Sequence, residues 1–398
     1  MTALNEDRTL LRRFLAELVK VDSPTRAGEL LVLEQQYPGE DEPSEDELER
    51  RGIPDGWIFN EDGWCVFIES KVLGRPGAAQ MESHRRTAAR RGFRHVTAVV
   101  IAPRLPSSAP SDCIFLEWRA VYSWLRRHSA TSIWAARAAE YLEIIEAKLV
   151  DSQQFVEGTL TMFSGFQFGR DHPFTYLEGK RVLGLAMGEL RKRADLKRVL
   201  GMNPAHPGRG AITGRNGDGV WDFLSLSTLQ KDESFTKQPH LTLGVLTDCI
   251  EAVVTVPNAV KKPMRPNILS LGEDGFRSLI EEIVENLSPV LRAQSGARPW
   301  FRGVQRRYPS QRAKPFVDAR IDFDLRTAFD SDEAPKMQPM WLSAAYHSFA
   351  DKRRSNYQIQ LGVLFPYEDC PALKTDKAVD LIAEAWIACK PLVDLAAR

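Results

Sequence analysis

Residues 54–71 read PDGWIFNEDGWCVFIESK. Two short apolar segments flank the polar residues 60–63, and this pattern is typical of two strands joined by a turn. A three-residue loop built on a type I turn would give Gly63 a positive φ and pair Asn60 with Trp64. We therefore predict a β-hairpin over this stretch.

The predicted register gathers charged side chains at the open end of the hairpin. Counting outward from the turn puts Asp55 directly across from Glu69, with their Cβ atoms roughly 4.5–5.5 Å apart. Because side chains alternate along a strand, Lys71 shares the face of Glu69 while Ser70 points away. Two carboxylates this close repel each other unless a cation or a proton lies between them.

A hard divalent cation suits such a pair. Mg2+ binds through one or two carboxylates and keeps several waters, as in sites that act on phosphates. A lysine beside the ion can orient or deprotonate a water and neutralise the charge that develops in the transition state. The predicted chemistry is metal-assisted hydrolysis of phosphodiester bonds.

Pro54-Asp55 followed by Glu69-x-Lys71 resembles the PD-(D/E)xK nuclease superfamily, which includes many restriction endonucleases. The resemblance covers residues 1–150 only. It implies that Asp55 and Glu69 bind Mg2+, with Mn2+ as a substitute, that the Ser70 carbonyl adds a ligand, and that Lys71 assists the attacking water. It also implies an α/β fold, a restriction-endonuclease-like αβα core with a mixed sheet.

The residues around the motif favour this interpretation. Residues 66–68 are apolar on both faces, as in a strand inside a sheet, yet they lead into Glu69 and Lys71. A surface hairpin with a Glu–Lys pair is the alternative. After the hairpin we expect a helix over 80–91 that ends at Gly92, and then a strand over 95–101.

Strand, helix and strand in this order form the βαβ unit of a mixed sheet. A further strand over 113–116 leads into a helix over 117–127 that carries Trp118 on its apolar face.

The predicted helix after the hairpin adds candidates. Superfamily members often place Gln or Glu at its start, so Gln80 is a candidate for orienting substrate or water, although a solvated residue is an equal alternative. His84, one turn later on the same face, is a candidate for contacting substrate or for packing. The family commonly supplies one more acid from its N-terminal helix, and the sequence does not choose between Glu29 and Glu34.

Charge is unevenly distributed near the proposed site. Residues 39–49 hold seven acids in eleven positions and predict a solvated or disordered segment. Arg85, Arg86 and Arg90 are candidates for binding substrate phosphates, with a plain solvated helix face as the alternative. The formal net charge of +0 restricts any contact with nucleic acid to a local surface.

The chain of 398 residues has room for two or three cores. We predict a nuclease-like domain over 1–150 and an α+β module with a mostly antiparallel sheet over 151–398. Helices are expected over 182–200 and 376–395. Asp318, Asp322 and Asp324 alternate along one predicted strand, where a half-exposed strand face explains them more simply than a cation site does.

Five cysteines without a C-x-x-C pair indicate reduced thiols, and the absence of a targeting segment or a long apolar run predicts a cytoplasmic protein with no membrane span. We therefore expect a Mg2+-dependent phosphodiesterase that cleaves nucleic acid, with DNA favoured over RNA, in bacterial restriction or antiviral defence. A second copy of the chain or a defence-system protein is a further expected partner. The alternative is an idle nuclease fold that binds nucleic acid or serves as a scaffold.

Overall fold

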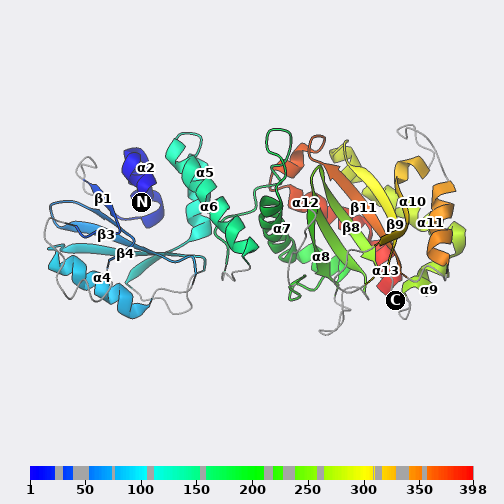
Figure 1. Ribbon diagram of the computed structural model, residues 1–398, viewed down its shortest axis with the longest axis horizontal. Coiled ribbons are helices and arrows are strands. Elements are labelled where there is room, and N and C mark those ends of the chain that lie inside the picture. The colour runs from blue at the N-terminus through cyan, green and yellow to red at the C-terminus, as the bar shows by residue number, and fades with distance from the viewer. Residues whose placement is uncertain are drawn as a thin grey trace. The chain divides into compact units, whose positions relative to one another are not determined.

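The computed structural model describes residues 1–22, 30–38, 53–73, 77–104, 112–152, 158–209, 218–226, 238–257, 264–307, 309, 316–328, 340–351 and 356–397. The acidic stretch 39–49 and Glu29 lie outside these residues. The chain divides into two compact units, Met1–Met162 and Phe163–Arg398 (Figure 1). The first unit extends past residue 150 because the buried Glu146 carboxylate accepts the backbone N–H of Leu160 at 2.8 Å.

The first unit contains a mixed five-stranded sheet. Its strands lie in the order β1 (Leu31–Glu34), β2 (Gly56–Phe59), β3 (Trp64–Ser70), β4 (His95–Ala102) and β5 (Cys113–Glu117). The first three strands are antiparallel, whereas β3, β4 and β5 are parallel. Helix α4 (Ala78–Arg90) connects β3 to β4, so the predicted βαβ unit is confirmed.

The hairpin of β2 and β3 has the predicted register. Gly56 pairs with Ile68, and the Asn60 N–H donates to the Trp64 carbonyl at 3.0 Å. Gly63 has a φ of +86°, as the turn requires. The position of a Cβ on this glycine would lie 3.3 Å from the Gly92 carbonyl oxygen, so the turn also packs closely against the end of α4.

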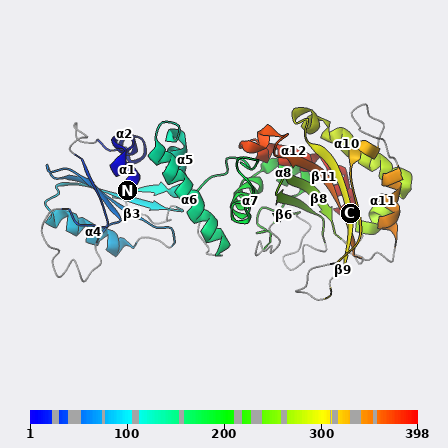
Figure 2. The same cartoon turned by 45° about the horizontal axis from the view of Figure 1, so that its top comes forward.

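Alternating residues of the strands bury both faces of this sheet. Trp57, Phe67 and Val100 pack against Met81 and Ala88 of α4. On the opposite face, a second core joins β2, β3 and β4 to five helical segments: α1 (Thr2–Glu6), α2 (Arg8–Arg13), the π-helical η1 (Phe14–Val19), α5 (Trp118–His128) and α6 (Ile133–Asp151). The unit is therefore a three-layer α/β/α sandwich (Figure 2).

Two helix N-termini on that opposite face are joined by one carboxylate. Asp7 is the N-cap of α2, and its Oδ1 accepts the Leu10 N–H at 2.9 Å. Its Oδ2 accepts the hydroxyl of Ser132 at 2.5 Å, and that hydroxyl in turn accepts the Ala135 N–H at the start of α6. Asp7 thus caps α2 directly and holds the Ser132 hydroxyl that caps α6.

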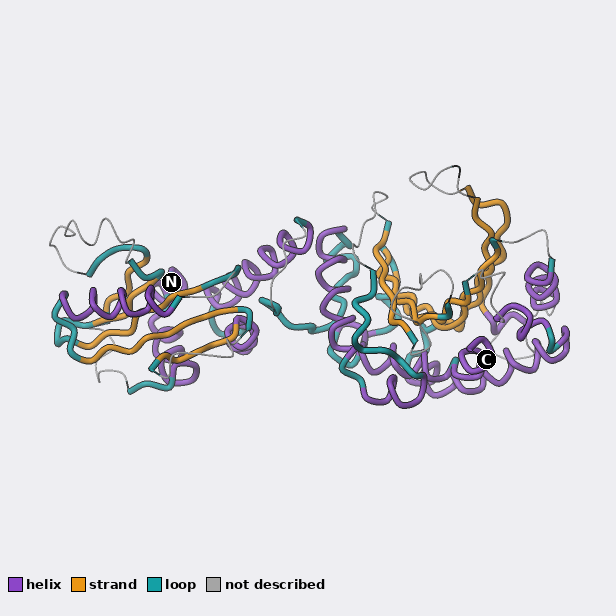
Figure 3. The backbone as a smooth tube through the Cα atoms, turned by 90° about the horizontal axis from the view of Figure 1, so that it is seen from below, coloured by secondary structure: helices purple, strands orange, loops and turns teal. Residues whose placement is uncertain are grey.

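The second unit contains an antiparallel six-stranded sheet, as predicted. Its strand order is β10 (Phe316–Asp324), β9 (Arg298–Arg307), β11 (Tyr357–Pro366), β8 (Cys249–Val256), β7 (His240–Leu246) and β6 (Gly219–Ser225). Among the described residues, seven α-helices contribute to one continuous apolar core with this sheet: α7 (Tyr176–Arg191), α8 (Ala194–Leu200), α9 (Met264–Leu269), α10 (Gly272–Ala293), α11 (Met340–Ala350), α12 (Ala378–Ala388) and α13 (Lys390–Ala397). The sheet curves strongly, and these helices line its outer side (Figure 3).

Two predicted helices of this unit are each split in two. The expected helix over 182–200 is interrupted between α7 and α8. The break lies at Arg193, whose backbone is extended and whose guanidinium pairs with Asp195 at 2.6 Å. The expected helix over 376–395 is α12 and α13. Pro391 lies in the first turn of α13, where its missing N–H leaves no helical bond unmade.

Strand β10 forms one edge of the second sheet and has a bulge between Val317 and Ala319. Its aspartates are paired with arginines: Asp318 with Arg307, Asp322 with Arg302 and Arg320, and Asp324 with Arg326. These ion pairs agree with the half-exposed strand face that we predicted. Among the helices of the described residues, none is long and apolar enough to cross a membrane.

Candidate active site

Glu69 lies at the carboxyl end of β3, the central strand of the first sheet. It follows Cys65 and Phe67 on the face that packs against α4, and only 1% of its surface is exposed. An ionised carboxylate at such a position requires hydrogen-bond donors or cations close by.

Three side chains supply them. Gln80 Nε2 donates to Glu69 Oε1 at 2.7 Å, and His84 Nε2 lies 3.2 Å from Oε2. Lys71 Nζ lies 2.5 Å from Oε1. The structure therefore brings together four of the residues that the sequence singled out, and two of them stand one turn apart on α4.

These contacts determine the charge of Glu69. Burial alone would raise the pKa of this carboxyl, but hydrogen bonds from His84 and Lys71, together with their charges, more than offset that effect. The pKa of Glu69 lies below its ordinary value, and the side chain is a carboxylate at neutral pH.

Asp55 lies one residue before β2, at the same edge of the sheet. Its Oδ2 accepts the backbone N–H of Ser70 at 2.6 Å and the Ser70 hydroxyl at 2.7 Å. Asp55 therefore contacts Ser70, the residue predicted to point away from the face of Glu69 and Lys71. The chain bends at Asp55, beyond the last residue pair of the hairpin, so its carboxylate reaches across the end of β3 to the residue between Glu69 and Lys71.

The strand end that carries these groups is fixed on its other side. The Lys71 N–H donates to the Ile101 carbonyl of β4 at 2.8 Å, and Trp118 Nε1 donates to the Lys71 carbonyl at 2.9 Å. The sequence indicated Trp118 only as a packing residue. Its position as the first residue of the helix after β5 is the signal that could have suggested this contact.

The predicted substrate-binding residues lie in different environments. Arg85 is held by Asp112 at 2.8 Å, whereas the side chain of Arg86 is 60% exposed and lies 3.9 Å from Glu82. Arg90 donates to the hydroxyl of Thr87 at 3.2 Å. His84 is fully buried against Glu69 and is not on the surface with the arginines.

Of the two acids that could join the site, Glu29 lies outside the described residues. Glu34 pairs with Gly56 at the same sheet edge, but its carboxylate accepts the hydroxyl of Thr2 at 3.3 Å. Thr2 belongs to α1, on the face opposite to α4. Glu34 therefore lies away from Gln80 and His84.

A cation at this strand end would have few protein ligands. Among the described residues, no group of three or more His, Cys, Asp or Glu side chains is arranged to hold a metal ion. Mg2+ needs only one or two carboxylates because it keeps most of its waters. Oδ1 of Asp55 accepts no hydrogen bond from the part of the chain that the structure describes, and Glu69 is ionised. The donor set thus suits Mg2+ or Mn2+ better than Zn2+, which prefers nitrogen and sulfur.

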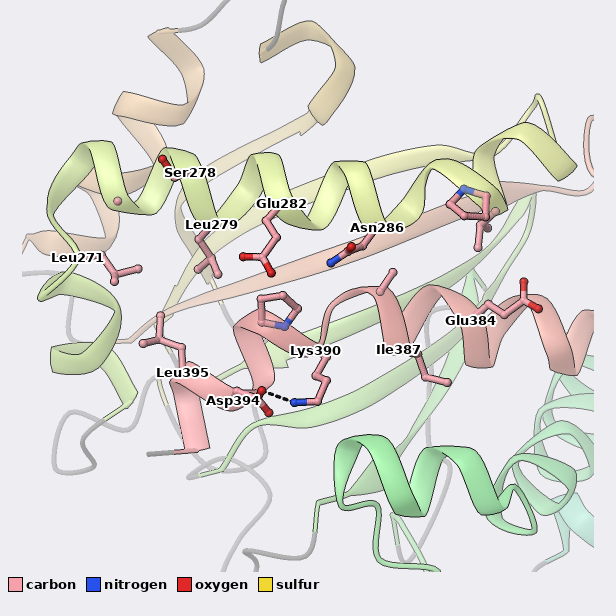
Figure 4. A pocket seen from close by; sticks show the side chains of 15 residues that line it. Leu271, Ser278, Leu279, Glu282, Asn286, Glu384, Ile387, Lys390, Asp394 and Leu395 are labelled. Carbon is pink, nitrogen blue, oxygen red and sulfur yellow. Dashed lines mark hydrogen bonds and ion pairs between the residues drawn. The ribbon is translucent and has the colours of Figure 1, made fainter.

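The second unit has a groove of about 900 Å3 between α10 and the pair α12 and α13 (Figure 4). Leu279 and Ile387 are among its apolar lining residues, Glu282 points into it, and Lys390 is paired with Asp394. Its excess of carboxylates disfavours phosphate, so we do not assign nucleic acid to this groove.

No family model matches the chain, and no curated protein and no solved structure matches it.

Proposed function

We propose that the first unit is a metal-dependent nuclease with a restriction-endonuclease-like core, which hydrolyses phosphodiester bonds of nucleic acid and prefers DNA. The observation that carries the proposal is the environment of Glu69. This carboxylate is buried and ionised at the end of a central strand, within 2.5–3.2 Å of Lys71, Gln80 and His84.

A purely structural ion pair explains these contacts less well. Removing a carboxylate from water is costly, and an apolar residue of similar volume would pack at least as well in this position. Clusters in which burial and specific charges act on the same titratable group are concentrated at functional sites. The lysine is 29% exposed while its partner is buried, so the pair lies at the border of the core, where a substrate can reach it.

The resemblance implies the roles, and the contacts of Glu69 with Lys71 and Gln80 support those of these two side chains. Asp55 and Glu69, with the Ser70 carbonyl, would hold the metal ion. When bound, Mg2+ would supply a Lewis acid that lowers the pKa of a water ligand and offsets charge on the phosphate. Lys71 would orient the attacking water and stabilise the developing charge. Gln80 would restrain Glu69, and Arg86, whose side chain is 60% exposed, would contact a substrate phosphate.

The layer structure supports the same proposal. A mixed sheet covered by helices on both faces, with the acids at the end of a parallel strand, agrees with the fold that the resemblance implies. The second unit would supply specificity, sensing or assembly. A cytoplasmic role in bacterial restriction or antiviral defence, with a second copy or a defence-system protein as partner, remains our expectation for the whole chain.

Cleavage assays test this proposal directly. The full chain is incubated with plasmid, linear duplex, single-stranded DNA and tRNA, in Mg2+ or in EDTA. We expect metal-dependent cleavage that is abolished by Glu69→Gln and by Asp55→Asn. Glu140→Gln, which changes an exposed acid on α6 of the same unit, is the matched control and should retain activity.

Two results would contradict the proposal: cleavage that persists in EDTA, or normal cleavage by Glu69→Gln. If the wild-type chain cleaves no substrate but retards DNA in a gel, the alternative of an idle nuclease fold that binds nucleic acid is favoured instead.

A further inference from the structure

His84 is a polar ring inside an apolar core. It is fully buried, and its ring meets Phe67 edge to face, with centroids 5.7 Å apart. Met81 and Ala88, which stand on the same side of α4, pack against the sheet with ordinary apolar contacts. Burying an imidazole here is costly unless its hydrogen bonds are made.

The hydrogen bond to Glu69 has a defined direction. Because Glu69 is ionised, its oxygens can only accept, so Nε2 of His84 carries the proton and donates to Oε2. The contact is therefore a hydrogen bond to an anion, which is stronger than one between neutral groups.

The two oxygens of Glu69 are held in different ways. Oε1 receives Gln80 at 2.7 Å and Lys71 at 2.5 Å, and both of these side chains are partly exposed. Oε2 receives His84, whose ring cannot move without opening the core between β3 and α4. Among these three donors, His84 is thus the one whose position is fixed by packing.

We propose that His84 is a positioning residue that fixes the orientation of the Glu69 carboxylate for metal binding. This inference rests on the proposed function of the first unit. In this role His84 hydrogen-bonds the metal ligand Glu69 and does not contact the substrate. Removing a group that hydrogen-bonds a ligating carboxylate typically weakens metal binding by about 10–100-fold.

The experiment compares variants of the full chain that separate hydrogen bonding from packing. His84→Leu fills the core without a donor, whereas His84→Gln keeps an N–H that can reach Oε2. Thr87→Val is the matched control, because Thr87 is also buried on α4 and its hydroxyl accepts from Arg90. Mn2+ affinity is measured by calorimetry, and kcat and KM are measured on a labelled duplex.

We expect His84→Leu to weaken Mn2+ binding by about 10–100-fold, while His84→Gln recovers most of the loss and Thr87→Val loses nothing. kcat at a fixed Mn2+ concentration should fall in His84→Leu with little change in KM for the duplex. A KM effect without a change in Mn2+ affinity would restore the substrate-contact role and overturn the inference. So would a folded His84→Leu that binds Mn2+ like the wild type, or a Gln variant as weak as the Leu variant.

A measurement on the wild-type chain covers the case in which His84→Leu does not fold. The 15N resonance of His84 Nε2 should shift when Mg2+ is added, because the carboxylate that it contacts gains a ligand. A resonance that ignores saturating Mg2+ would overturn the inference. If the wild-type chain binds neither Mn2+ nor Mg2+, the proposed function itself fails, and this outcome is distinct from a normal wild type with an unaffected His84→Leu.

Discussion

Lys71 and Glu69 form an unequal pair. The carboxylate is fixed by two residues of α4, whereas the ammonium group, 2.5 Å from Oε1, belongs to a side chain that is 29% exposed. A metal ion bound by Glu69 would approach a region where Lys71 already neutralises the charge. An incoming ion must therefore compete with Lys71 for the Glu69 carboxylate, although catalysis is expected to need both.

Lys71→Met separates these two effects. We expect turnover to fall by roughly 10²–10⁴-fold, the range for a group that handles a proton in the transition state. Mn2+ should bind more tightly than in the wild type, because the competing charge is gone. Single-turnover cleavage and calorimetry measure the two quantities, and Lys148→Met, which alters an exposed lysine of α6, is the control. Near-normal cleavage by Lys71→Met would remove this lysine from the mechanism.

At the scale of elements, the register of the hairpin could be predicted because residues of its own turn determine it. Asn60 and Gly63 restrict the turn to few conformations, and the turn then sets every pair up to the acids. The position of the Asp55 carboxylate was not predictable in this way, because it depends on a bend beyond the last pair. The partnership of His84 with Glu69 depends on which face of α4 packs on the sheet, and helical spacing alone does not determine that.

The turn glycines provide a matched test. Gly63 and Gly92 both have positive φ, +86° and +82°, but a Cβ on Gly63 would meet the Gly92 carbonyl, whereas a Cβ on Gly92 would meet nothing within 4 Å. Gly92→Ala should lower the free energy of unfolding of the first unit by about 1–2 kcal/mol, the cost of the left-handed backbone. Gly63→Ala should cost more. Urea titrations followed by hydrogen exchange of β3 peptides measure the difference, and equal losses would contradict the crowding argument.

The shared cap of α2 and α6 should give a pH-dependent stability. Burial alone would raise the pKa of Asp7, but hydrogen bonds from Ser132 and from backbone N–H groups outweigh it, so the pKa lies below its ordinary value of 3.8. A carboxyl with a lowered pKa in the folded state stabilises above its unfolded pKa, and this contribution is lost as pH falls through the folded value. Asp7→Ala should therefore destabilise the first unit at pH 7, by about 0.5–2 kcal/mol for a lost cap.

The same substitution should matter much less at a pH below the folded-state pKa of Asp7, which itself lies under 3.8, because the wild-type carboxyl is protonated there too. Urea titrations at both pH values, read by hydrogen exchange in peptides from α2 and α6, test whether the loss of stability in Asp7→Ala is smaller in acid. Asp62→Ala, in the exposed hairpin turn, is the control. An Asp7→Ala effect that is as large in acid as at neutral pH would contradict the linkage.

At the scale of the whole molecule, each unit has its own core. The residues that surround β3 share no cluster with the residues that surround β8. The alternation of strands and helices made two separate cores predictable, but the end of the first unit was set by the buried Glu146, whose partners lie in residues 158–162. Such a contact between a helix and a later loop has no local signature in the sequence.

Calorimetry of the full chain should therefore resolve two unfolding transitions. Mn2+ should raise the midpoint of one transition only, since a ligand that binds the folded state stabilises the unit that holds it. Glu69→Gln should abolish that shift and leave the other transition unchanged. Hydrogen exchange near each midpoint assigns the transitions to their units. A metal-induced shift in the second unit, or one that survives Glu69→Gln, would place the ion elsewhere.

The ion pairs of β10 have a consequence for how the chain behaves among its own copies. A strand at the border of a sheet has unpaired backbone groups on one side, and these can recruit a strand from another molecule. In β10 a bulge interrupts the regular spacing, and Asp318, Asp322 and Asp324 with their arginines would have to be desolvated before a second strand could dock. These charges therefore disfavour the pairing of a strand from a second copy with β10, the border strand of this sheet among the described residues.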